Sequence, residues 1–318
     1  HRGTLAADVA GMSIRIRPNG GTLTNEGTLR ASANGTLEVL GAWSGNGILN
    51  VDGGTLNLGG TFSRESMGTL TRTGGTVNIT GTLNNAGGRL ALNAATGSWN
   101  LAGGTIAGGT ITGSDGARLN LSSGTLDGVT LGTDSDFAGM IRIRNGLTVN
   151  GTATIGYFAG MQIEGTQTLG GVGTIVFGNF GYQAIYVTSS SSTLTIDSGL
   201  TIRGGGNQPN SASMGYSDYF GGGSNTSIIN RGTIAADAAG MRIQVQPNGG
   251  TLTNEGTLRA AGGSLEALGL GANTGTIRSE TGSTVTITGS WSNPGTIVLD
   301  GGTLNLGGTF TLATLGTL

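Results

Sequence analysis

All five tyrosines of this sequence lie between positions 157 and 220, together with Phe158, Phe177, Phe180 and Phe220. Aromatic rings stack on the apolar faces of sugars and on partner side chains, while nearby amides and hydroxyls bind polar groups. Residues 203–230 lack the periodicity seen elsewhere, so we expect them to protrude as a loop. The alternative is that some of these rings fill the interior and the loop binds nothing. We predict that a glycan or a protein binds there to Asn207, Gln208, Tyr216, Asp218, Tyr219 and Phe220.

One compact group of charges contains Asp134 and Asp136, followed by Arg142 and Arg144. Two carboxylates near arginines suit acid–base cleavage of a polysaccharide or the binding of Ca²⁺. The competing interpretation is a solvated turn beside outward-facing arginines. It is favoured because Arg15 alternates with isoleucines in the same manner elsewhere in the chain.

The residue types that are missing exclude many chemistries. There is no cysteine and no lysine, and the single histidine is His1. Schiff bases, cysteine nucleophiles, Ser-His-Asp triads and zinc sites built from histidine and cysteine are therefore excluded. We predict no catalytic residue, no metal site, no cofactor and no enzyme activity.

Charge and hydropathy limit the possible partners. Charged residues make up 10% of the chain and the formal net charge is −2, so nothing favours nucleic acid as a partner. No apolar run of about 18 residues indicates a membrane-spanning segment.

The positions of these residues depend on an internal repeat. The motif Asn-x-Gly-Thr-[Leu/Ile] begins at Asn25, Asn230, Asn254, Asn273 and Asn293. Recurrence at about 20 residues is typical of a solenoid, in which each repeat is one turn stacked on its neighbour. Identical residues at one corner of successive turns form hydrogen-bonded ladders, so we predict a structural ladder for these five asparagines.

A finer periodicity divides each turn into three short strands. Segments such as Thr303–Leu306 alternate between polar and aliphatic residues, and Gly, Asn or Asp follows each one at a corner. The sequence thus predicts an all-β, right-handed parallel β-helix with three strands per turn of about 20 residues, or about 16 turns in all. Four methionines that follow Ala-Gly are expected in its core: Met12, Met140, Met161 and Met241.

A long duplication supports the same architecture. Residues 2–70 recur at 231–318, and the two copies differ chiefly by the inserted segment 270–289, which has the length of one turn. Only the insertion of a whole turn keeps aliphatic side chains inside on all three faces. We expect residues 1–318 to form one continuous solenoid segment of a longer chain.

The recurring Asn-x-Gly-Thr-Leu units resemble the repeat regions of large bacterial secreted adhesins, of the filamentous-haemagglutinin and autotransporter-passenger type. The resemblance covers essentially the whole chain. It implies export to the bacterial cell surface or beyond, a shaft-like structural role, and binding through loops or flanking domains. We therefore expect an extracellular structural or adhesive rod, a repeat segment of a surface or secreted fibre protein. Its expected partners are further copies, joined end to end into filaments, and surface glycans or proteins of a host or neighbouring cell.

Two other functions remain as alternatives. A carbohydrate-binding or carbohydrate-active β-helix has the same architecture, but such enzymes gather carboxylates in one groove, and the 17 acidic residues here are widely spread. Ice binding needs a flat face of threonines that recurs in every turn. Pairs such as Thr22 and Thr24 occur in only some of the turns.

Overall fold

The computed structural model of the chain is all-β, and it describes residues 1–178, 181–205 and 210–316. The strands form about 14 stacked turns of about 21 residues, with parallel pairing between successive turns. This confirms the predicted parallel β-solenoid with three strands per turn, while its right-handed winding stays a prediction. The expected number of turns was too high because many turns are longer than the shortest spacing of the repeat motif. The chain divides into two compact units, His1–Asp136 and Phe137–Leu318.

The first unit contains three stacks of parallel strands. Its first stack is β1 (Thr4–Ala7), β4 (Thr28–Ser32), β7 (Ile48–Asp52) and β10 (Thr69–Arg72). The second is β2 (Ser13–Ile16), β5 (Thr36–Val39), β8 (Thr55–Leu58), β11 (Thr76–Ile79) and the beginnings of β14 (Trp99–Ala107) and β16 (Leu119–Leu131). The third is β3 (Thr22–Asn25), β6 (Ala42–Gly45), β9 (Thr61–Ser63), β12 (Thr82–Asn84) and later parts of β14 and β16. Strands β13 (Arg89–Leu92) and β15 (Thr110–Gly113) pair with each other, and β15 pairs with the end of β16; β17 (Ser135–Phe137) follows.

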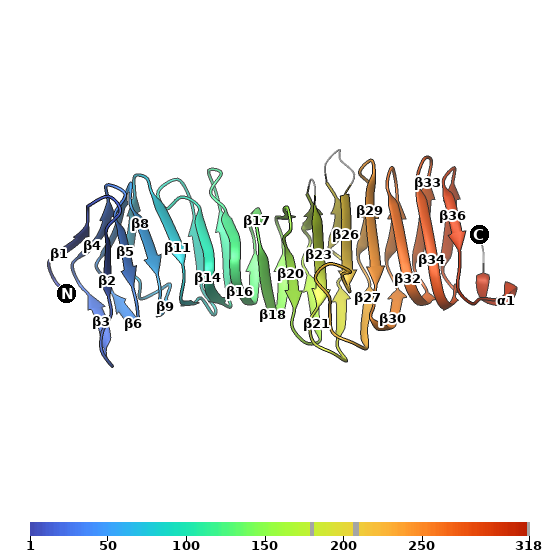
Figure 1. Cartoon of the computed structure of the whole chain (residues 1–318), viewed down its shortest axis with the longest axis horizontal. Coiled ribbons are helices and arrows are strands. Elements are labelled where there is room, and N and C mark those ends of the chain that lie inside the picture. The colour runs from blue at the N-terminus through green and yellow to red at the C-terminus, as the bar shows by residue number, and fades with distance from the viewer. Residues whose placement is uncertain (179–180, 206–209, 317–318) are drawn as a thin grey trace. The chain divides into compact units, whose positions relative to one another are not determined.

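The second unit also contains three stacks, whose strands lie side by side in Figure 1. One is β19 (Thr152–Ile155), β22 (Thr174–Phe177), β25 (Thr201–Gly204), β28 (Thr233–Ala236), β31 (Thr257–Ala260), β33 (Thr276–Glu280) and β35 (Thr296–Asp300). Another is the beginning of β18 (Met140–Val149), β20 (Gly160–Ile163), β23 (Tyr182–Val187), β26 (Asn210–Gly215), β29 (Met241–Gln246), the beginnings of β32 (Ser264–Asn273) and β34 (Thr284–Ser292), and β36 (Thr303–Leu306). The last is the end of β18, β21 (Gln167–Gly170), β24 (Thr193–Ile196), β27 (Thr226–Asn230), β30 (Gly249–Asn254) and the ends of β32 and β34.

Alternation along each short strand builds the core. In β5, Leu37 and Val39 are fully buried, while Thr36 and Glu38 face outward. Because the strands pair in parallel register, residues of the same type stack in successive turns. Leu37, for example, pairs with Leu56 of β8. Each buried leucine contributes about 2 kcal/mol of transfer free energy, so the stacked aliphatic columns stabilise the turns.

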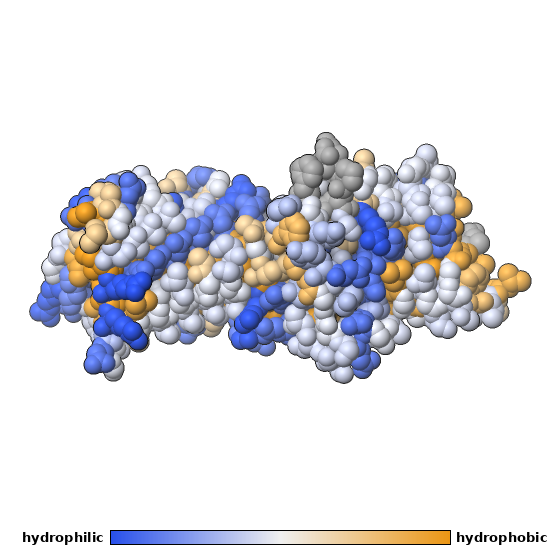
Figure 2. Space-filling view, in the orientation of Figure 1, coloured by the Kyte–Doolittle hydropathy of each residue, from blue (hydrophilic) through white to orange (hydrophobic). Residues whose placement is uncertain are grey.

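Few large apolar side chains reach the surface. Figure 2 shows a mostly pale exterior with hydrophilic clusters and several orange areas, one of them at the C-terminal end over helix α1 (Leu312–Leu315), where Leu312 is exposed. No helix among the described residues is long and apolar enough to cross a bilayer.

Two local predictions were wrong. Residues 203–230 are not a loop throughout, because β26 and β27 lie within that range and pair in the solenoid; among its described residues, the segment between these two strands, residues 216–225, is the excursion. Met12 is not core, because it precedes β2 in a turn and is 62% exposed, and Met140 is only partly buried. Met161 and Met241 lie within strands β20 and β29 and are fully buried.

Candidate binding site

Five aromatic rings gather on the surface of the second unit, and we call Tyr157, Phe158, Tyr182, Tyr219 and Phe220 the aromatic patch. Tyr182 and Tyr219 stack with an interplanar angle of 5° and ring centroids 4.9 Å apart. Phe158 packs edge-on against both, at centroid distances of 5.6 and 5.1 Å, and against Tyr157 at 4.5 Å. Phe220 meets Tyr219 edge-on at 4.8 Å. The three tyrosines remain 66%, 50% and 57% exposed in chain order, so the patch offers ring surface to a ligand.

A tight turn between β26 and β27 holds Tyr219 and Phe220. The backbone N–H of Ser217 donates to the carbonyl of Gly221 at 2.9 Å, and that of Gly221 donates back at 2.7 Å. The buried Ser217 hydroxyl oxygen accepts from the N–H groups of Tyr219 at 3.3 Å and Phe220 at 3.2 Å. Because these bonds fix the turn locally, both rings are positioned before any ligand arrives.

The turn before β20 supplies Tyr157 and Phe158. Phe158 has a φ of 50°, in the left-handed region that bulky residues rarely adopt. Such a conformation costs on the order of 1–3 kcal/mol, and residues held in it concentrate at binding sites. Gly181 accommodates the neighbouring ring, because a Cβ there would lie 2.6 Å from Cδ2 of Tyr157.

The register between turns explains how the rings meet. Met161 of β20 pairs with Ile185 of β23, and Tyr182 follows Phe158 along the chain by the same offset. The predicted site included Tyr219 and Phe220 but omitted Tyr157, Phe158 and Tyr182. The recurrence of an aromatic residue after one local turn length is the signal that indicates them.

Tyr186 of β23 lies beneath the patch. Its ring stacks on Phe220 at a centroid distance of 5.8 Å, and its hydroxyl accepts a hydrogen bond from Nε2 of Gln162 at 2.7 Å. Burial raises the pKa of Tyr186, and the hydrogen bond from Gln162 and the charge of Arg142 partly oppose that shift. The phenol therefore stays neutral at physiological pH and anchors the patch to the sheet.

The other predicted binding residues have different surroundings. Asp218 is exposed next to the patch. The pKa of Arg242 is raised chiefly by the hydrogen bond that Arg242 donates to Glu266, and the charge of Asp218 adds a smaller effect in the same direction. Tyr216 is half-buried, and its N–H donates to the carbonyl of Gln246 at 2.8 Å. The remaining two predicted residues, Asn207 and Gln208, lie outside the described residues.

Three of the four charged residues predicted to form a compact group, Asp136, Arg142 and Arg144, form ion pairs. Asp136 pairs with Arg118 at 3.1 Å within the first unit. Arg142 and Arg144 both pair with Glu164 within the second unit, at 3.5 and 2.5 Å. Exposed pairs of this kind contribute about 0–1 kcal/mol each. The geometry matches a solvated, charge-paired surface.

Four of the predicted ladder asparagines form a buried chain of hydrogen bonds in the second unit. Asn230 donates to Asn254 at 2.8 Å, Asn254 to Asn273 at 2.6 Å, and Asn273 to Asn293 at 2.5 Å. In the first unit, Asn25 donates instead to the carbonyl of Ile48 at 3.5 Å. The ladder has a structural role, because each amide donates to the next inside the corner of the solenoid; Oδ1 of Asn230, at its first member, is buried without a hydrogen-bond partner among the described residues.

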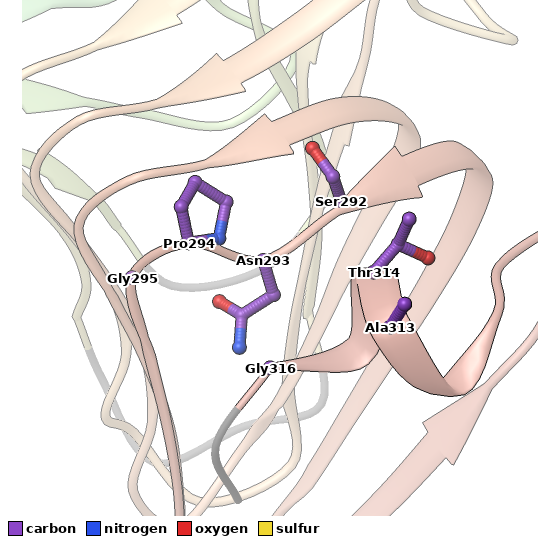
Figure 3. A pocket seen from close by; sticks show the side chains of 7 residues that line it. All are labelled: Ser292, Asn293, Pro294, Gly295, Ala313, Thr314 and Gly316. Atoms are coloured by element: carbon purple, nitrogen blue, oxygen red, sulfur yellow. The ribbon is translucent and has the colours of Figure 1, made fainter.

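The ladder ends at an open hollow of about 420 Å³ beside helix α1. Figure 3 shows the Asn293 amide directed toward the chain near Gly316. Its Nδ2 donates to the carbonyl of Leu315 at 2.9 Å, and its backbone N–H donates to the carbonyl of Thr314 at 2.7 Å. These bonds use the backbone N–H and one of the two side-chain N–H groups of Asn293.

Comparisons with known proteins give no family assignment. No protein-family model matches the chain, and no curated protein matches it significantly. A matching solved structure is the crystal structure of the TibC-catalyzed hyper-glycosylated TibA55-350 fragment, with a TM-score of 0.32 and 17% identity over 98% of this chain and 99% of that chain. Because that TM-score is low, the fold assignment depends on the strand pairings of this chain itself.

Proposed function

We propose that this chain is an extracellular β-solenoid segment with a structural and adhesive role, and that it binds glycans through the aromatic patch. The observation that carries the proposal is the cluster of Tyr157, Tyr182 and Tyr219, half or more exposed on strand β23 and on the turns beside it. Proteins rarely leave several large rings together in water without a partner. The proposed function includes no catalysis.

A glycan is the ligand that suits these rings best. The phenol rings offer flat faces for sugar rings and hydroxyls for polar contacts, and Asp218 adds an exposed carboxylate that accepts hydrogen bonds. Phe158, Tyr182 and Tyr219 come from successive turns, so the rings follow the direction in which turns are stacked. This arrangement suits an extended chain of sugar residues.

The location and the adhesive role are supported by the resemblance of the Asn-x-Gly-Thr-Leu units to bacterial secreted adhesins. The same resemblance supports display at the cell surface and association between copies into filaments. The stacked turns suit a scaffold, because each turn adds core only to its neighbours and the array is rigid without a separate globular core.

A glycan array with the full chain tests the binding proposal. Replacing Tyr182 and Tyr219 together by alanine is expected to weaken binding to the best glycan at least tenfold, because the central stacked pair is lost. The control variant is Val172→Ala, which shortens another exposed apolar side chain. It should bind within about twofold of the wild type.

Three results would contradict the proposal. They are the absence of binding to any glycan, equal binding by the double variant with an unchanged far-ultraviolet circular dichroism spectrum, and a protein ligand that binds while glycans do not. Release of reducing sugar ends from a bound polysaccharide would favour the alternative, a carbohydrate-active β-helix.

A further inference from the structure

One stack of the first unit is interrupted between two successive turns. Strand β10 is the last strand of the stack β1–β4–β7–β10, and the next strand along the chain at that face, β13, pairs on its other side with β15. In the described part of the chain no ladder joins β10 to β13, although β11 and β12 of the same turn both pair with β14. Two strand edges with unpaired backbone groups therefore border one gap.

The gap contains a cavity of about 280 Å³ with a mixed polar and apolar lining, whose apolar side chains include Met67, Leu70, Leu90 and Trp99. Leu70 is partly exposed, whereas its register partner Leu49 in β7 is fully buried. The indole N–H of Trp99 is buried without a hydrogen-bond partner among the described residues. Those of the other two tryptophans donate to backbone carbonyls, which marks the packing around Trp99 as incomplete.

Arg72 lies beside the gap, where the preceding turn has an aliphatic residue. It occupies an inward-facing position of β10, in register with the fully buried Val51 of β7. A guanidinium cannot enter an apolar core without polar partners. Arg72 instead donates to the carbonyls of Gly75 at 2.5 Å and Ser98 at 2.7 Å, which belong to successive turns. Burial lowers the pKa of Arg72.

We propose that this gap is a strand-insertion site, which binds an extended acidic peptide between β10 and β13. The two edges supply N–H and C=O groups for main-chain hydrogen bonds on both sides of the peptide. An apolar side chain of the peptide enters the cavity, and its outward neighbour, a carboxylate, is directed toward Arg64, which lines the cavity. A hydrocarbon ligand would fill the cavity but leave both edges unpaired.

A peptide from the chain itself provides the probe. Residues 35–41, Gly-Thr-Leu-Glu-Val-Leu-Gly, form a regular strand of this solenoid with two inward aliphatic side chains and one outward carboxylate. The acetylated, dye-labelled peptide is titrated with the full chain, and its fluorescence anisotropy is followed. We expect saturable binding, together with slower amide hydrogen exchange in residues 69–72 and 89–92.

Two changes to the probe test the binding mode without altering the protein. N-methylation of the central leucine, glutamate and valine removes main-chain donors and should weaken binding at least tenfold. A second probe has serine at the two positions that correspond to Leu37 and Val39. It lacks the apolar contacts, and its binding should be weakened to a similar extent.

The protein variant Arg72→Val tests the cause of the gap. Valine restores an aliphatic pair with Val51, so β10 and β13 should close on each other and peptide binding should fall at least tenfold. The matched control is Arg15→Val, which removes an outward-facing arginine that pairs with Glu38 at 2.6 Å; it should bind within about twofold of the wild type.

Several outcomes would overturn the proposal. One is the absence of saturable binding at millimolar peptide, and another is equal binding of the N-methylated probe. Exchange protection confined to other strands, or undiminished binding by a folded Arg72→Val variant, would place the peptide elsewhere. Decanoate that binds the chain while the peptide does not would identify the gap as a hydrocarbon pocket.

Discussion

Replacing Asn254 by alanine is expected to destabilise the second unit strongly, because Asn254 is the second member of the buried asparagine ladder. Its Oδ1 accepts from Asn230 at 2.8 Å, and its Nδ2 donates to Asn273 at 2.6 Å and to the carbonyl of Thr276 at 3.2 Å. Asn230, Asn254 and Asn273 are all fully buried, so water cannot replace these bonds without opening the corner.

The size of the effect follows from the polar groups that lose partners. Alanine leaves Oδ1 of Asn273 without its donor, and Nδ2 of Asn230 keeps only the carbonyl of Thr257 at 3.2 Å. An orphaned buried polar group costs about 1–3 kcal/mol. One fully and one partly orphaned group together give an expected loss of about 3 kcal/mol in the free energy of unfolding.

Urea unfolding followed by circular dichroism measures this loss, with Asn305→Ala as the matched control. Asn305 is an exposed asparagine that donates to Thr286 at 3.3 Å, so its replacement should change the unfolding free energy by less than about 0.5 kcal/mol. Because solenoids unfold in segments, hydrogen exchange in β30 and β32 provides a local readout. Equal stability of the two variants would refute the assignment of a stabilising ladder.

Two further predictions concern a corner glycine and an ion pair. Gly256→Ala should cost at least about 2 kcal/mol of unfolding free energy, because the new Cβ would overlap the backbone carbonyl of Gly232. At Gly282 a new Cβ meets open space, so Gly282→Ala should cost only about 1 kcal/mol, which comes from the positive φ of that residue. Similar urea midpoints for the two variants would contradict this prediction. A hydrogen bond from Arg259 is the main reason that the pKa of Glu280 is lowered in the folded protein. Glu280 therefore stabilises the folded state at a pH above the pKa that it has in the unfolded chain. This stabilisation is lost as the pH falls through the pKa of Glu280 in the folded protein. Arg259→Gln should therefore reduce the difference between the urea midpoints at pH 7 and pH 3, and an unchanged difference would rule out that linkage.

The repetitive part of the fold could be predicted because each turn presents the same local pattern. Alternation in segments such as Thr36–Val39, followed by a corner glycine, indicates strand direction and the buried face without knowledge of distant contacts. The register of β26 could not be predicted in this way. Its sequence, Asn210–Gly215, has no long aliphatic side chain except Met214, so it pairs through its backbone while giving little hydrophobic signal.

The aromatic patch was only partly predictable for a related reason. Tyr219 and Phe220 were identified by composition, but Tyr157, Phe158 and Tyr182 join them through an offset between turns that depends on turn length. Turn length varies along the chain, because Met140 pairs with Gly160 whereas Met161 pairs with Ile185, which lies further along the chain from its partner. Sequence therefore indicates which residue types are unusual more readily than which of them meet.

Both proposed sites arise where one turn departs from the repeat. At each of these positions a regular turn would bury a side chain or pair a strand with its neighbour. At the patch, an excursion of residues 216–225 brings Tyr219 over rings from other turns. At the gap, one charged residue in an aliphatic position, Arg72, replaces a backbone ladder by side-chain bonds to carbonyls. Because each turn contacts only its nearest neighbours, either departure is tolerated locally without loss of the stack. A solenoid can therefore carry binding sites wherever a single turn breaks the pattern, and the strands on both sides keep each site rigid.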